Sequence, residues 1–284
     1  MKGISCNSNF LADKPVEQAI DKLAEHGYDA IDICLELAPP FHPIPTPHMH
    51  PDDSAAKRKQ VRQAAESAGV AIAAMNAHTN LCARDPETRQ ANKEFVAKSI
   101  ILGAELGAEV VVTVAGGKDA YGYEQWFWEW SIEILRELLP LADQHGMKLA
   151  IEAGSPPGCL VYNLETMQRL LATDGCESIG ALFDPAHYHI RGDKVTEVVQ
   201  ALGKKIVHMH AKDATGNPEN IVFPPLGQGE IDFDALLGAL SAEGFEGYIA
   251  MEYEAFAWNF SKDQDAVLSS SKAFLDALVK KHWS

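Results

Sequence analysis

The sequence alternates eight times between a short run of β-branched and other apolar residues and a longer segment with helical periodicity. The short runs are 3–6, 30–35, 71–76, 109–114, 148–152, 179–184, 206–210 and 248–252. The helical segments lie near 14–26, 54–68, 88–107, 124–145, 163–173, 194–202, 232–243 and 262–281. Strict alternation of strands and helices predicts a parallel sheet whose strands are joined by right-handed crossovers.

The number of strands favours a closed barrel over an open sheet. The last helical segment ends the eighth pair, and no Gly-x-Gly-x-x-Gly follows the first strand, where a dinucleotide-binding sheet would need it. No linker or low-complexity tract interrupts the pattern. The 284 residues are also close to the roughly 250 of a typical (β/α)₈ barrel. We therefore predict a single-domain α/β fold, a (β/α)₈ TIM barrel over residues 1–284.

Charge and composition argue against several classes of partner and setting. The formal net charge is −16 and no basic stripe is present, so we expect no binding to nucleic acid or to an anionic membrane. No apolar stretch approaches the roughly 20 residues of a membrane span. The first residues read as a strand and not as a signal peptide, and the five cysteines contain no CxxC pair. We therefore expect a cytoplasmic protein with reduced thiols.

The longest connections are 36–53, 115–123, 153–162 and 211–231, and each follows a predicted strand. In a barrel this places them on the C-terminal face, where barrel enzymes carry their active sites.

The last four predicted strands each end at a side chain that can bind a metal. These side chains are Glu152, Asp184, His210 and Glu252. Ionised carboxylates that emerge from apolar strands are costly unless a positive charge compensates them. A ligand set of carboxylates and one imidazole suits an octahedral Mn²⁺, Mg²⁺ or Co²⁺ better than a structural Zn²⁺. The pattern therefore predicts one divalent ion on the rim of the barrel.

From residue 148 onward the sequence resembles the xylose isomerase-like superfamily of sugar isomerases and epimerases. The similar segments are 149–152, 184–187, 208–213, 226–232 and 247–252. The resemblance to ketohexose 3-epimerases implies that one ion, Mn²⁺ in the first place, is held by Glu152, Asp184, His210 and Glu252. It further implies that Glu152 and Glu252 exchange protons with a small carbohydrate, that His187 touches this substrate, and that the protein is a homo-oligomer, a dimer or tetramer.

The positions of the two glutamates suggest a reaction. Glu152 and Glu252 end strands that lie three apart around the ring, so they would approach a bound substrate from separate directions. One carboxylate could remove the proton next to a carbonyl, and the other could return a proton to the opposite face, while the metal stabilises the enediolate. This predicts a metal-dependent isomerase or epimerase of a keto-sugar, sugar phosphate or related polyol.

The alternative enzyme is a metal-dependent lyase of the inosose dehydratase or 3-keto-glycoside type, which would remove the same proton and expel a β-substituent. A non-catalytic barrel is a further alternative, but the complete ligand set argues against it.

Two departures from the pattern of ketohexose 3-epimerases leave a free ketohexose as one possible substrate among several. Residues 153–158 lack the further glutamate expected there, and Lys212 and Asp213 stand near the position of an expected arginine. The additional histidine and Asp-x-His ligands of the endonuclease IV branch are missing, which together with the net charge of −16 argues against a role in DNA repair.

Other residues are candidates for contacts to the substrate. Asn76 and His78, at the end of the third strand, could hydrogen-bond substrate hydroxyl groups. Lys212 could contact a substrate oxygen or phosphate or simply pair with Asp213. Trp126 could stack on a sugar face, although helix packing explains it equally well. His208 faces the same way as His210 because strand residues alternate, and it sits deeper, so we expect it to have a supporting role.

Overall fold

The computed structural model describes residues 1–35, 48–117, 124–154, 158–254 and 258–283. Its strands are β1 (Gly3–Asn7), β2 (Ala30–Cys34), β3 (Ala71–Asn76), β4 (Val110–Val114), β5 (Lys148–Glu152), β6 (Gly180–Phe183), β7 (Ile206–Ala211) and β8 (Tyr248–Met251). Each strand pairs in parallel with the next, and β8 pairs with β1 to close the barrel. The predicted (β/α)₈ barrel is confirmed.

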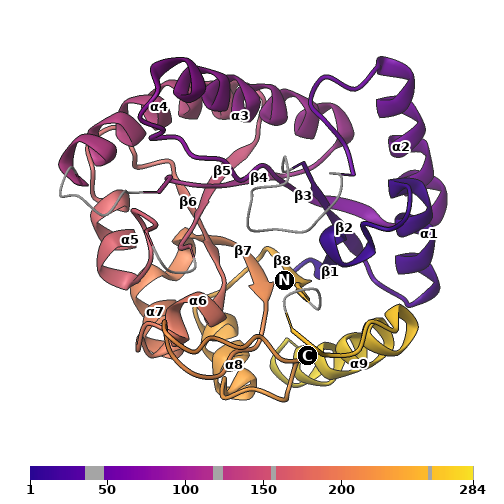
Figure 1. The fold of residues 1–284 in the computed structure, drawn as a ribbon. Coiled ribbons are helices and arrows are strands. Elements are labelled where there is room, and N and C mark those ends of the chain that lie inside the picture. The colour runs from indigo at the N-terminus through magenta and orange to yellow at the C-terminus, as the bar shows by residue number, and fades with distance from the viewer. Residues whose placement is uncertain (36–47, 118–123, 155–157, 255–257, 284) are drawn as a thin grey trace.

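The helices form a ring around the barrel, as Figure 1 shows. They are α1 (Val16–Glu25), α2 (Ala55–Ala68), α3 (Pro86–Leu106), α4 (Glu124–Gln144), α5 (Leu164–Leu171), α6 (Pro185–His189), α7 (Val195–Leu202), α8 (Phe233–Ala242) and α9 (Gln264–His282), with short 3₁₀ turns η1 (Ser8–Leu11) and η2 (Gly203–Lys205). In the described part of the chain, no helix is both long and apolar enough to cross a membrane.

Helix α6 was not predicted from the sequence. Asp184 ends the extended segment, and its Oδ1 accepts a hydrogen bond of 2.9 Å from the amide of Ala186. Pro185 occupies the first helical position, where its missing N–H costs nothing. The Asp-Pro pair therefore starts a helix immediately at the rim. It also fixes the backbone of the loop that carries His187.

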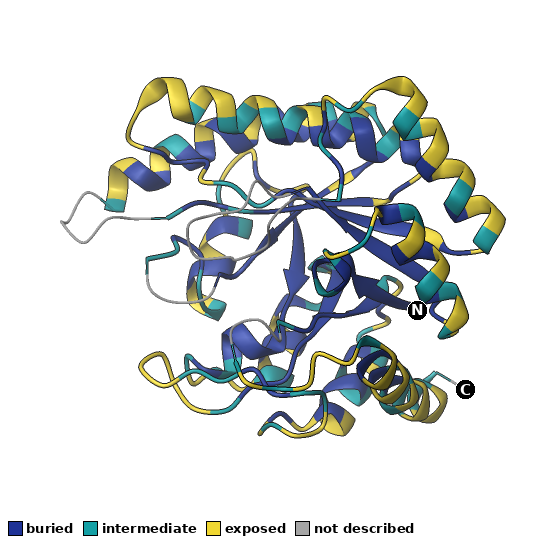
Figure 2. Ribbon diagram, turned by 45° about the vertical axis from the view of Figure 1, so that its right-hand side comes forward, coloured by how far each residue is buried: buried dark blue, intermediate teal, exposed yellow. Residues whose placement is uncertain are grey.

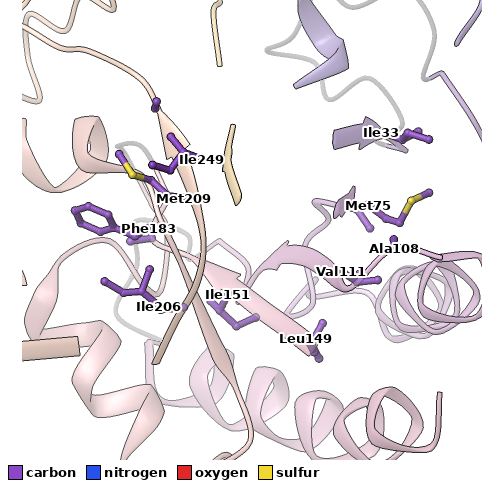
Figure 3. Close-up of a cluster of buried hydrophobic side chains, with 14 of the residues drawn as sticks. Ile33, Met75, Ala108, Val111, Leu149, Ile151, Phe183, Ile206, Met209 and Ile249 are labelled. Carbon is purple, nitrogen blue, oxygen red and sulfur yellow. The ribbon is translucent and has the colours of Figure 1, made fainter. Parts of the chain in front are cut away.

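Strand alternation separates the core into two layers. Outward-facing residues such as Leu149, Ile151 and Met209 belong to a large hydrophobic cluster between the strands and the helices. Figure 3 shows part of this cluster. Figure 2 shows the strands largely buried, while the helices expose their outer faces. Inside the barrel a smaller apolar cluster consists of Ala74, Val110, Val112, Ala150 and Leu182. The barrel interior is therefore apolar where β3 to β6 contribute.

The other side of the interior, formed by β1, β2, β7 and β8, is polar. The alternation that turns Ile4, Ile31, Ile33 and Met209 outward turns Ser5, Asn7, Asp32, His208 and His210 inward, and all of these polar side chains are buried. Buried polar groups are costly unless they pair. This polar half of the interior leads up to the C-terminal rim, so it positions whatever site the rim carries.

Parts of three of the long connections, 36–47, 118–123 and 155–157, lie outside the described residues. Connection 211–231 is described in full, and Asp213 organises it. The Asp213 carboxylate accepts hydrogen bonds of 2.9 Å from the amides of Ala214, Gly227 and Gly229. Asp213 is thus fully engaged with the backbone and does not pair with Lys212.

Candidate metal centre

Glu152, Asp184, His210 and Glu252 converge at the C-terminal rim. Each offers one ligand atom, and these atoms lie within 4.8 Å of one another. His210 Nδ1 is 3.4 Å from Glu152 Oε1 and 3.2 Å from Glu252 Oε2. Oxygen and nitrogen ligands lie about 2.0–2.2 Å from ions such as Zn²⁺ and Mg²⁺, so opposite ligands are at most about 4.4 Å apart. The cluster therefore has nearly the dimensions that one ion requires.

The hydrogen bonding of the cluster also fits a cation. Within the described residues, the buried atoms Glu152 Oε1, Asp184 Oδ2 and His210 Nδ1 have no hydrogen-bond partner. Asp184 Oδ2 does form an ion pair of 2.9 Å with Lys212 Nζ. Unsatisfied buried carboxylate oxygens are costly, and coordination of a metal removes that cost. The donor set is one imidazole nitrogen and three carboxylates, which suits a hard or borderline divalent ion.

The two glutamates stay ionised although they are buried. Burial raises the pKa of a carboxyl group, but His78 and His210 outweigh this effect at Glu152 and hold its pKa well below the usual range. At Glu252, Lys212 and His210 likewise outweigh burial and lower the pKa. Both side chains therefore carry the negative charge that a metal ligand, or a base that removes a proton, must have.

Two further histidines contact the cluster. His78 Nε2 lies 2.6 Å from Glu152 Oε2, so His78 touches a predicted ligand as well as standing at the rim. His187 Nδ1 donates to the carbonyl of Ala153 at 2.6 Å, and its Nε2 lies 3.4 Å from Asp184 Oδ2. Helix α6 and the end of β5 thus hold His187 against the carboxylates. Whether His78 and His187 contact a substrate stays a prediction.

Lys212 is the buried cation of the site. Its side chain is 4% exposed, and its Nζ lies 2.9 Å from Asp184 Oδ2, 2.8 Å from Glu252 Oε2 and 3.5 Å from Glu254 Oε2. Burial lowers the pKa of a lysine, but Asp184 and Glu252 outweigh it and raise the pKa of Lys212 well above its usual value. Of the two sequence-based interpretations, pairing with Asp213 is wrong, and a substrate contact stays a prediction.

The aromatic side chain beside the cluster is not Trp126. Trp126 lies in the first turn of α4 and is 55% exposed. Phe223, from connection 211–231, instead packs its ring 6.0 Å from that of His187 and 5.0 Å from Lys212 Nζ. The ring of Trp258 lies 5.0 Å from that of Phe223. The stacking role of Trp126 stays a prediction, and Phe223 is the aromatic residue in contact with the charged groups.

Sequence reasoning missed several partners of the ligands. Asn7 Nδ2 donates to Glu252 Oε1 at 2.8 Å, and Asn9 Nδ2 lies 3.4 Å from the same oxygen. Asn76, which the sequence offered with His78 as a candidate for hydrogen bonds to the substrate, is 0% exposed at the end of β3 and leaves both amide atoms without a hydrogen-bond partner among the described residues. A polar residue directly after an apolar strand was the available signal for Asn7, and it was followed for the third strand and the last four strands but not for the first.

The chain matches the family described as xylose isomerase-like TIM barrel over residues 20–278. It belongs to this family. The inosose isomerase of Bacillus subtilis (strain 168) is 31% identical over 160 residues, which are 54% of this chain and 56% of that protein. This chain thus spans about half the length of the inosose isomerases it matches.

Two other relatives align over more of the chain. The fructoselysine 3-epimerase of Escherichia coli O157:H7 is 24% identical over 244 residues, covering 84% of this chain and 85% of that protein. The crystal structure of the IOLI protein with a bound zinc atom superposes with a TM-score of 0.79 at 23% identity, covering 99% of both chains. At this identity the superposition shows a shared fold.

Proposed function

We propose that this family member is a divalent-metal-dependent isomerase or epimerase that moves the proton next to the carbonyl of a keto-sugar or related polyol. The observation that carries the proposal is the placement of two ionised, buried glutamates, Glu152 and Glu252, which stand at the ends of strands three apart around the barrel and lie 3.4 Å and 3.2 Å from His210 Nδ1. The similarity to an inosose isomerase and to a fructoselysine 3-epimerase supports this class of reaction.

The residues divide the work of proton transfer. Glu152 Oε1 has no hydrogen-bond partner among the described residues, so besides facing the ion it keeps a lone pair that can accept the proton of the substrate C–H bond. Its other oxygen is 2.6 Å from His78, which holds the carboxylate in position. Glu252, fixed by Asn7 at 2.8 Å, would take a proton from the Lys212 ammonium at 2.8 Å and pass it to the opposite face of the same carbon, and solvent would then reload Lys212 and accept the proton held by Glu152. Transfer between the two faces inverts that carbon.

Glu152, Asp184, His210 and Glu252 would hold the ion, and we propose Mn²⁺, with Mg²⁺ or Co²⁺ as alternatives. Support for a metal comes from the unsatisfied donor atoms and from the zinc atom of the related IOLI structure. When bound, such an ion polarises a carbonyl and stabilises the negative charge that develops on the substrate oxygens. The ion and the substrate together would provide partners for the polar atoms of the rim that have no hydrogen bond.

The test is a screen for proton exchange with solvent. The protein is loaded with Mn²⁺ and incubated in D₂O with keto-sugars, inososes and 3-keto-glycosides, and the products are separated and analysed by mass spectrometry and NMR. The proposal expects an isomer or epimer that carries deuterium at the carbon next to the carbonyl. A dehydrated, unsaturated product would assign the site to a lyase instead and overturn the isomerase proposal.

A matched pair of variants links the activity to the site. Glu152→Gln removes the proposed base and should abolish deuterium incorporation. Glu109→Gln, at the start of β4 on the opposite rim, removes a carboxylate that pairs with Lys2 and should leave incorporation unchanged. Equal activity of the two variants would contradict the role of Glu152.

A further inference from the structure

Beneath the candidate metal centre, the barrel interior holds a carboxylate that the proposed reaction does not use. Asp32 lies in the middle of β2, between Ile31 and Ile33, and is 0% exposed. Its Oδ1 accepts a hydrogen bond of 2.5 Å from Ser5 Oγ on β1. Its Oδ2 lies 2.6 Å from Nε2 of His208 on β7. The neighbouring strand β1 and the more distant strand β7, which only the closed barrel brings close, thus fix this carboxylate.

The charge of the buried Asp32 carboxylate requires an explanation. Burial alone raises the pKa of Asp32, yet the pKa is lowered, because the imidazoles of His208 and His210 outweigh burial. A buried charge of this kind is often no more stable than an apolar residue of the same size. Stability of the barrel therefore does not account for Asp32, and its neighbours have to be considered.

The neighbour that matters is His210. Its Nδ1 faces Glu152 and Glu252, and its Nε2 lies 3.6 Å from Asp32 Oδ2. This separation exceeds a hydrogen bond by about half an ångström, a shift that a small ring rotation supplies. An imidazole that binds a metal through one nitrogen carries its hydrogen on the other, and a carboxylate that accepts this hydrogen fixes the tautomer and the direction of the ring.

We propose that Asp32, held in place by Ser5 and His208, is a positioning residue that keeps the hydrogen of His210 on Nε2 and so presents Nδ1 to the metal ion. The inference rests on the proposed metal centre and adds to it a residue inside the barrel that contacts a ligand and not the ion. Asp32 itself touches neither ion nor substrate. Its effect acts through His210, on the affinity and the geometry of the site.

A second metal site is the competing interpretation of the same residues. Asp32, His208 and His210 each offer a ligand atom within 4.8 Å of one another. The contact of 2.6 Å between Asp32 Oδ2 and His208 Nε2 has the length of a charge-assisted hydrogen bond, so His208 Nε2 carries a hydrogen and has no lone pair for a metal, while Asp32 Oδ2 keeps a second lone pair for His210. We therefore expect one ion per chain and not two.

The first experiment measures the affinity for Mn²⁺ by isothermal titration calorimetry. Asp32→Asn keeps the size of the side chain but removes its charge, and loss of such a partner typically weakens metal binding by about 10–100-fold. Asp29→Asn is the matched control, since Asp29 precedes the same strand and accepts a hydrogen bond of 2.8 Å from the amide of Ile4. The control should keep the affinity of the wild-type protein.

The second experiment needs no variant, and so decides the matter even if Asp32→Asn fails to fold. Histidine-specific ¹⁵N NMR on the wild-type protein loaded with diamagnetic Zn²⁺ reports which nitrogen of His210 carries hydrogen. The proposal expects the metal on Nδ1 and, on Nε2, a hydrogen whose ¹H resonance is shifted downfield by a hydrogen bond to the Asp32 carboxylate. The reverse assignment, or an Nε2 hydrogen without this downfield shift, overturns it.

The outcomes separate this inference from the proposed function. Unchanged Mn²⁺ affinity in Asp32→Asn, or two ions per wild-type chain, overturns the role of Asp32 and leaves the metal-dependent function standing. A wild-type protein that binds no ion overturns both.

Discussion

Removal of the Lys212 charge should destabilise the metal-free protein and have little effect on the metal-bound protein. Lys212→Met keeps most of the apolar side chain but leaves Asp184, Glu252 and Glu254 without the ammonium that now lies 2.8–3.5 Å from them. Breaking a buried ion pair on one side costs about 3–5 kcal/mol. With about 2.1 cal/mol/K per residue, the 284 residues give an unfolding entropy near 0.6 kcal/mol/K, so Tm should fall by about 5–8 °C.

A bound divalent ion should restore most of this loss, because it supplies positive charge to the same carboxylates. The assay is differential scanning calorimetry of both proteins, once with EDTA and once with saturating Mn²⁺. Lys281→Met serves as the control, since Lys281 pairs with Asp234 at the surface and such a pair contributes at most about 1 kcal/mol. An equal loss of Tm with and without Mn²⁺, or no loss in EDTA, would refute this reasoning.

Three further predictions concern the reaction, a loop and a helix contact. Glu252→Gln should lower kcat for proton exchange by about 10²–10⁴-fold at saturating Mn²⁺, as measured by deuterium incorporation, because it removes one of the two proton carriers. Gly229→Ala should lower the free energy of unfolding by about 1–3 kcal/mol in urea titrations, because its Cβ would lie 2.1 Å from Asp213 Oδ1. Burial raises the pKa of Glu17, but Lys57 at 2.7 Å outweighs burial and lowers it, so Glu17→Gln should cost up to about 1 kcal/mol above pH 4.5 and progressively less as the pH falls below that value.

Each of these predictions has a result that would contradict it. Full exchange activity in Glu252→Gln would remove that residue from proton transfer. Wild-type stability of Gly229→Ala would mean that the loop tolerates displacement of Asp213. A stability difference for Glu17→Gln that grows as the pH falls would have the wrong sign, because protonation of Glu17 must weaken its attraction to Lys57.

The strands and the four candidate ligands could be predicted because each depends on local sequence. An apolar run that stops at Glu152 or His210 marks the end of a strand, and parallel closure brings such ends together without further information. Helix α6 was missed because a proline usually indicates a break in a helical pattern. Pro185 instead occupies the first position of the helix, directly after the capping residue Asp184.

The partners of the ligands could not be predicted, because they depend on how distant strands meet. Asp32 reaches His208 across 176 residues and Asn7 reaches Glu252 across 245, and both contacts require the closed barrel with its register. Lys212 was ambiguous because Asp213 is its neighbour in sequence, while its ion pairs come from β6 and β8. The alternation of strand residues predicted that His208 faces the barrel interior. It could not predict that His208 contacts Asp32, because Asp32 lies in β2, far from His208 in the sequence.

Metal content measures the central claim most directly. The wild-type protein and a Glu152→Gln, Asp184→Asn double variant are equilibrated with Mn²⁺, dialysed together and analysed by inductively coupled plasma mass spectrometry. Four ligand atoms within 4.8 Å of one another predict about one ion per wild-type chain and almost none in the double variant. Equal metal content in the two proteins would contradict the metal centre and the function proposed from it.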